Sequence, residues 1–189
     1  MRKNILLNLA NIVCKFSRLL LVLAFLSLTI LFIHIQIDKG FYEGSNVELN
    51  KYEFFYSIIK HEVTSLGNNN ERAFTLDKVT MVSLYINYLR YTLILGIIFM
   101  IFKEFQKIIE SAQNIETFQK ENVVSFRRIG NYIFGYFLLT SIYFMGFETG
   151  SLTGFNVSFT PLLLVLLAYI MAELFKEGHL LKQENDLTI

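Results

Sequence analysis

The chain alternates between four long apolar runs and shorter stretches in which its charged residues gather. The apolar runs cover residues 17–37, 80–103, 129–148 and 160–176, and Pro161 marks the first turn of the fourth. An α-helix rises about 1.5 Å per residue, so runs of this length cross or nearly cross a hydrocarbon core about 30 Å thick. The pattern predicts an all-α, polytopic membrane protein with four transmembrane helices in a bundle.

The polar stretches predict how these helices are connected. We expect an extracytoplasmic loop at 38–78, a cytoplasmic loop at 104–128 and a cytoplasmic tail at 177–189. In the first loop, Asn50 and Glu53 have the spacing of a capping box, and apolar residues follow at helical intervals, which predicts a short extracytoplasmic amphipathic helix. No Pro-, Gly- or Ser-rich linker interrupts the 189 residues, so a single membrane domain is expected.

Composition and charge support a membrane protein and indicate its orientation. Hydrophobic residues make up 53% of the chain, more than the surface of a water-soluble globule can accommodate, and the net charge of +1 gives no basic field for direct nucleic-acid binding. The N-terminal segment, the loop before the third run and the tail together hold eleven Lys and Arg, whereas the other two loops hold five. The positive-inside rule therefore predicts cytoplasmic N- and C-termini.

Residues with catalytic potential are sparse. The sequence contains no phosphate-binding loop, dinucleotide fingerprint, nucleophile elbow or zinc-protease motif. His34, His61 and His179 lie far apart in the sequence, and the single Cys14 has no partner for an intramolecular disulfide. We therefore expect neither an enzyme nor a bound metal or cofactor.

Arg90 is the one full charge in the central part of an apolar run, and such a charge is a functional hypothesis by default. A structural role is the first alternative: Arg90 extends toward the interface among neighbouring tyrosines, or it pairs with Glu148 across the bundle. The second alternative is a gate or a ligand-binding charge. Insertion does not decide between them, because the apolar residues around Arg90 outweigh the cost of one central arginine.

Two cytoplasmic stretches carry the most distinctive residues. The first contains Phe118, Asn122, Arg127, Arg128, Ile129 and Gly130, and the second contains Phe175, Gly178, Leu181, Glu184, Asn185, Leu187, Thr188 and Ile189. Their spacing resembles two motifs of a family of bacterial four-helix membrane proteins known as domain of unknown function 2975. Thr117 stands where a proline often precedes the first Phe of that family.

The resemblance implies a multi-pass protein of the bacterial cytoplasmic membrane that works with a cytoplasmic helix-turn-helix regulator. On this hypothesis the partner-binding candidates are Phe118, Asn122, Arg127, Arg128, Phe175, Gly178, Leu181, Glu184, Asn185 and Leu187. The tail can equally pack its apolar stripe against the second helix, and the two arginines are also suited to anchor the topology.

A regulatory or sensory partner of that regulator is thus the first functional expectation. A small transporter or channel subunit is the alternative, although the runs offer few polar residues for a path across the membrane. Both hypotheses allow a homo-oligomer, and both place the protein in the lipid bilayer.

Overall fold

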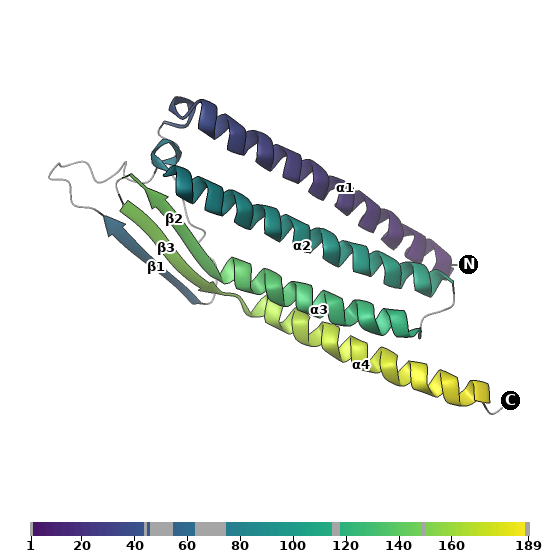
Figure 1. Ribbon diagram of the computed structural model, residues 1–189. Coiled ribbons are helices and arrows are strands. Elements are labelled where there is room, and N and C mark those ends of the chain that lie inside the picture. The colour runs from purple at the N-terminus through teal and green to yellow at the C-terminus, as the bar shows by residue number, and fades with distance from the viewer. Residues whose placement is uncertain are drawn as a thin grey trace. The chain divides into compact units, whose positions relative to one another are not determined.

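The computed structural model describes residues 2–43, 45, 55–62, 75–114, 118–148 and 150–187. Within these residues the chain is mostly helical, with one small antiparallel sheet (Figure 1). The helices are α1 (Arg2–Ile37), α2 (Met81–Gln113), α3 (Lys120–Ser141) and α4 (Phe159–Leu187). The strands are β1 (Phe55–Glu62), β2 (Ile142–Phe147) and β3 (Gly150–Val157), and two short 3-10 turns are η1 (Gly40–Tyr42) and η2 (Leu76–Lys78).

Three of the described helices are long and apolar enough to cross a membrane. They are Ile5–Ile37 in α1, Met81–Gln113 in α2 and Phe159–Asn185 in α4. Helix α3 is not among them: its first half carries charged residues, and the less polar part, 129–141, covers only about 20 Å at 1.5 Å per residue. Three helices thus suit a membrane protein, and the fourth crossing stays a prediction.

Helices α1 and α4 are longer than the apolar runs that predicted them. Helix α1 begins at Arg2, not near residue 17, and α4 continues to Leu187 through most of the stretch expected as a polar tail. The added segments mix polar residues with leucines and isoleucines at helical spacing, so they continue a helix without continuing an unbroken apolar run.

The expected helix in the 38–78 loop is wrong for the part that the structure describes. Phe55–Glu62 forms strand β1, which pairs antiparallel with β3 from Phe55 opposite Val157 to Glu62 opposite Gly150. This segment is rich in aromatic and β-branched residues, which favour a strand when a neighbouring strand is available. The residues of the predicted capping box, Asn50 and Glu53, lie outside the described residues.

The third apolar run was also predicted wrongly at its end, because helix α3 stops at Ser141 and strand β2 follows. Strand β2 pairs antiparallel with β3, which occupies the stretch expected as a loop, and the strand order is β1-β3-β2. An apolar run with aromatic and β-branched residues does not by itself distinguish helix from strand. Pairing with β3 decides the outcome here.

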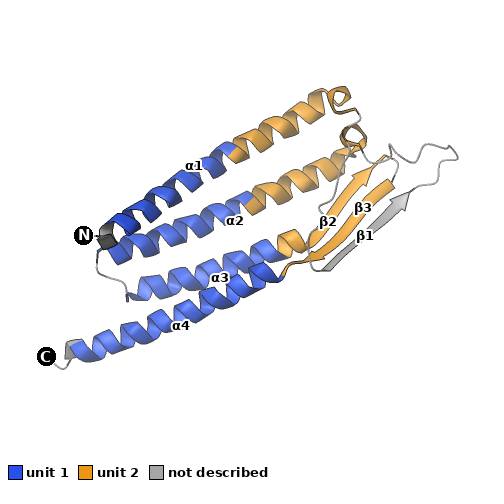
Figure 2. Ribbon diagram, turned by 180° about the vertical axis from the view of Figure 1, so that it is seen from behind, with its two compact units in different colours: residues 1–23, 95–137, 159–189 blue, residues 24–94, 138–158 orange. Residues whose placement is uncertain are grey.

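The chain divides into two compact units, each with its own small core (Figure 2). Unit 1 consists of residues 1–23, 95–137 and 159–189, and its core residues Val123, Phe126 and Ala172 come from α3 and α4. Unit 2 consists of the remaining residues. Its core contains Val79, Phe147 and Leu152. The single domain expected for the whole chain stays a prediction.

In unit 2, one polar face of α2 holds strand β2 in place. Asn87 is 6% exposed, and its Nδ2 donates to the backbone oxygen of Phe144 at 3.0 Å. Ser83 is 1% exposed, and its Oγ accepts from the backbone N–H of Gly146 at 2.9 Å, while Thr80 Oγ donates to the oxygen of Gly146 at 3.2 Å. Thr80 directly precedes α2, and Ser83 and Asn87 lie on one face of the helix, so the start of α2 satisfies backbone groups of strand β2.

Replacing Asn87 should destabilise this arrangement. Asn87→Leu keeps the volume but leaves the oxygen of Phe144 without its donor, so the free energy of unfolding should fall by about 1–3 kcal/mol. Titration with a denaturant in mixed micelles measures this free energy of unfolding. The control is Ile86→Ala on the exposed face of the same helix, and equal losses in the two variants would contradict the assigned role.

Candidate functional site

The distinctive residues of the first motif surround a buried polar cluster in unit 1. Glu104 of α2 is 4% exposed, and its carboxylate accepts from Ser125 Oγ of α3 at 2.8 Å. Asn122, one turn earlier on α3, is 2% exposed and donates from Nδ2 to Ser111 Oγ at 2.8 Å. Side chains of α2 and α3 thus satisfy one another away from water.

Two cations neutralise the buried carboxylate. Lys107 Nζ lies 2.6 Å and Arg128 Nη1 3.6 Å from Glu104 Oε1, and both cationic side chains are about half exposed. A buried carboxylate without such partners would be costly, so Glu104 depends on them. Sequence reasoning missed Glu104, although a signal exists: it stands in series with Ile97, Ile101 and Ile108 at alternating spacings of four and three.

A second group of motif residues joins the start of α3 to α4. The rings of Phe118 and Phe126 pack on Phe175, with centroids 5.5 Å and 4.8 Å away. The backbone oxygen of Phe118 also lies 2.8 Å from His179 Nδ1. The absence of a side chain at Gly178 lets the Phe118 ring approach α4, since a Cβ at that position would lie 2.6 Å from Phe118 Cε1. We call Phe118, Phe175 and Gly178 the aromatic clasp.

The basic pair of the first motif is divided between two contacts. Arg128 faces Glu104, whereas Arg127 Nη2 donates to Glu173 Oε1 of α4 at 2.7 Å. Lys176 Nζ lies 3.1 Å from the other oxygen of Glu173. The side chains of Arg127, Glu173 and Lys176 are about half exposed, so water screens these ion pairs and they contribute little to stability.

The remaining candidates of the second motif lie on an exposed stretch of α4. Leu181 is 60% exposed, and Glu184 and Asn185 are also exposed. The side chain of Leu187 is not among those that the structure describes. The motif is thus divided between residues that hold unit 1 together and residues that face outward, and a partner can reach only the outward set while the helices stay packed.

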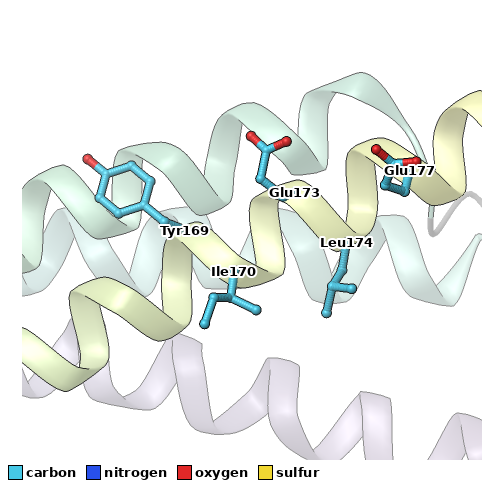
Figure 3. A pocket seen from close by; sticks show the side chains of 5 residues that line it. All are labelled: Tyr169, Ile170, Glu173, Leu174 and Glu177. Atoms are coloured by element: carbon cyan, nitrogen blue, oxygen red, sulfur yellow. The ribbon is translucent and has the colours of Figure 1, made fainter.

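An apolar groove of about 350 Å³ lies along α4. Tyr169, Glu173 and Glu177 form one wall, and Ile170 and Leu174 form the other. Figure 3 shows Tyr169 and Glu173 projecting from one side of the helix and Ile170 and Leu174 from the other. Two ridges at four-residue spacing with a groove between them are the usual surface on which a second helix packs.

Arg90 lies in unit 2 and caps the end of a helix. Its Nε donates to the backbone oxygen of Leu139 at 2.9 Å, in the last turn of α3, where carbonyl groups have no partner within the helix. Its guanidinium lies 5.5 Å from the centre of the Tyr143 ring and 5.8 Å from that of Tyr91. Among the described ion pairs none joins Arg90 to Glu148. The gate or ligand role stays a prediction.

The described residues hold no group of three or more His, Cys, Asp and Glu side chains that could bind a metal ion. The arrangement in unit 1 instead provides packed helices with an outward apolar face. An apolar helix face of this kind is suited to binding another protein.

Comparison with known proteins gives one match. The model of the family described as "Protein of unknown function (DUF2975)" matches residues 67–189, which is more than half of the chain. The match includes both motifs and the helices that carry them. No curated protein and no solved structure matches the chain.

Removing the charge of Glu104 should loosen α2 from α3. Glu104→Gln leaves Lys107 and Arg128 without their shared counter-charge, and we expect a loss of about 1–3 kcal/mol in the free energy of unfolding. Glu121→Gln on the exposed face of α3 is the matched control and should change it by a few tenths at most. Indistinguishable unfolding curves for the two variants would contradict the role of Glu104.

A methyl group at position 178 should break the aromatic clasp. Gly178→Ala forces the Phe118 ring aside and should lower the free energy of unfolding by about 1–3 kcal/mol. In a Phe118→Ala background the same change should cost nothing, so a double-mutant cycle isolates the contact. Gly96→Ala, with no atom within 4 Å of the added Cβ, controls for helix propensity. A cost that persists without the Phe118 ring would rule out the clasp as its cause.

Proposed function

The chain belongs to the DUF2975 family, and from this premise we propose that it is a multi-pass protein of the bacterial cytoplasmic membrane that recruits a cytoplasmic helix-turn-helix regulator. In this proposal the membrane helices are a scaffold and the outward face of α4 is the docking surface. The role is one of binding, without catalysis. The exposed apolar stretch of α4 is the observation that carries the proposal.

The proposal includes four crossings with both termini in the cytoplasm. Three long apolar helices and the distribution of Lys and Arg support it. The apolar part of α3 is short for a crossing, so residues at the start of β2 complete it. Non-helical backbone is tolerated at membrane depth only where other groups of the protein form hydrogen bonds with it. Asn87 donates to the backbone oxygen of Phe144, and Arg90 donates to that of Leu139.

The length of α4 brings its last turns into the cytoplasm. Its 29 residues extend about 43 Å at 1.5 Å per residue, against a core of about 30 Å. The part that extends beyond the core presents Leu180 and Leu181, which are 45% and 60% exposed. Large apolar side chains exposed in water on a packed helix are typical of a docking surface.

Charge indicates the kind of partner. Glu177 lines the α4 groove and is exposed, whereas Glu173 in the same groove is already paired with Arg127 and Lys176. A partner with basic side chains around an apolar centre would complement this face, and DNA-binding regulators carry basic surfaces. The transporter alternative has less support, because Asn87 and Arg90, two polar side chains of unit 2, each donate to a backbone oxygen of the protein itself.

A cation introduced on this face should release the regulator. Leu181→Lys places a cation where a basic partner must approach, and we expect about tenfold weaker binding, equivalent to 1.4 kcal/mol. The measurement is co-purification, in mild detergent, of a tagged helix-turn-helix regulator from the same organism, produced together with this chain. Phe105→Lys on α2, another exposed apolar position of unit 1, is the control. Equal recovery of the regulator with both variants would refute the proposed docking surface.

A further inference from the structure

The N-terminal part of α1 turns its polar side toward its own protein. Within unit 1, Gln113 of α2 donates to Asn8 Oδ1 at 3.0 Å, and Arg18 Nη1 donates to Gln106 Oε1 at 2.7 Å. Cys14 is buried between these contacts, at 7% exposure. Residues 8–18 of α1 therefore lie alongside residues 106–113 of α2.

These contacts place this part of α1 outside the hydrocarbon core. The facing stretch of α2 contains Lys107 and Glu110, and Lys103 and Glu104 come directly before it. Such a density of charge belongs in the headgroup region or in water. The 36 residues of α1 extend about 54 Å, far more than the roughly 30 Å core, so one end of this helix must project beyond it.

The opposite face of the projecting part of α1 is apolar and uncovered. Ile5, Leu9, Ile12 and Phe16 are 64%, 56%, 62% and 58% exposed, and we call these four residues the α1 seam. A water-facing helix normally shows the reverse arrangement, with apolar residues inward and polar residues outward. Four large apolar side chains on one side of a projecting helix mark an interaction surface.

We propose that the α1 seam packs against the same seam of a second copy of this chain, as a parallel coiled coil. The spacings of four, three and four are those of the a and d positions of a heptad, and Leu19 and Leu23 continue them along the helix. Copies inserted in one membrane share their orientation. A two-fold axis along the membrane normal therefore brings each seam residue opposite its own copy.

Charge supports a second copy as the occupant of the α1 seam. No seam position is charged. The nearest flanking cation, Lys15, falls at a g position. In a parallel pair this position faces the e position of the next heptad, which is the uncharged Leu20. The exposed series on α4 differs, because Glu177 interrupts it between Leu174 and Leu181. In a symmetric pair Glu177 would meet its own copy, and like charges at such a position repel. Self-association thus uses α1, and the proposal does not depend on the identity of the partner of α4.

Cysteine cross-linking in native membranes tests the proposal. Ile12→Cys and Phe16→Cys are made in a Cys14→Ser background, and tagged and untagged full-length chains are produced together and oxidised in isolated membranes. A disulfide needs Cα atoms within about 7 Å, so both variants should give about tenfold more tagged–untagged dimer than Leu181→Cys. The unaltered chain, whose Cys14 is buried on the opposite face of α1, is the second control and should give none.

Absence of the dimer at both seam positions would overturn the proposal, and so would equal dimer at Leu181→Cys, which would indicate random collision. A disulfide adduct with a different protein at Ile12 would also overturn it. Light scattering in mild detergent gives an independent measurement without cysteines. Leu9→Lys should shift the protein mass from two copies to one, whereas Phe105→Lys should leave it at two, and an unchanged mass for Leu9→Lys would count against the seam.

Discussion

Polar groups withdrawn from water need partners within the protein, and helix α2 supplies them in both units. In unit 2, Ser83 and Asn87 satisfy the backbone of β2. In unit 1, the buried carboxylate of Glu104 accepts from Ser125 and faces Arg128. Each of these groups would be costly if left alone in an apolar surrounding, so each contact fixes the neighbouring element more firmly than apolar packing between smooth helices could.

This constraint explains why the distinctive residues of the two motifs are divided in their roles. Asn122 and Gly178 are used within unit 1, where a side chain at Gly178 would collide with Phe118. Leu181 makes the opposite contribution, because it leaves an apolar position exposed on a helix that is already held in place. A rigid helix that presents such positions loses little conformational entropy when a partner binds.

The sequence was a good guide wherever one element decided its own structure. The apolar runs predicted the courses of α1, α2 and α4, because a helix that satisfies its own backbone needs only length and hydropathy to cross a membrane. The motifs directed attention to Phe118 and Asn122, whose role in binding a partner stays a prediction. Their contacts are with the protein itself.

What the sequence determined by itself was therefore the family and three helices that are long and apolar enough to cross a membrane. Only the tertiary structure decided that Phe55–Glu62 and Ile142–Phe147 are strands, because both pair with β3 and strand pairing depends on residues distant in sequence. It also decided that Glu104 is buried and that Arg90 caps α3. A sequence shows that burying a charged side chain would cost free energy, but only the folded chain shows which groups pair with that side chain.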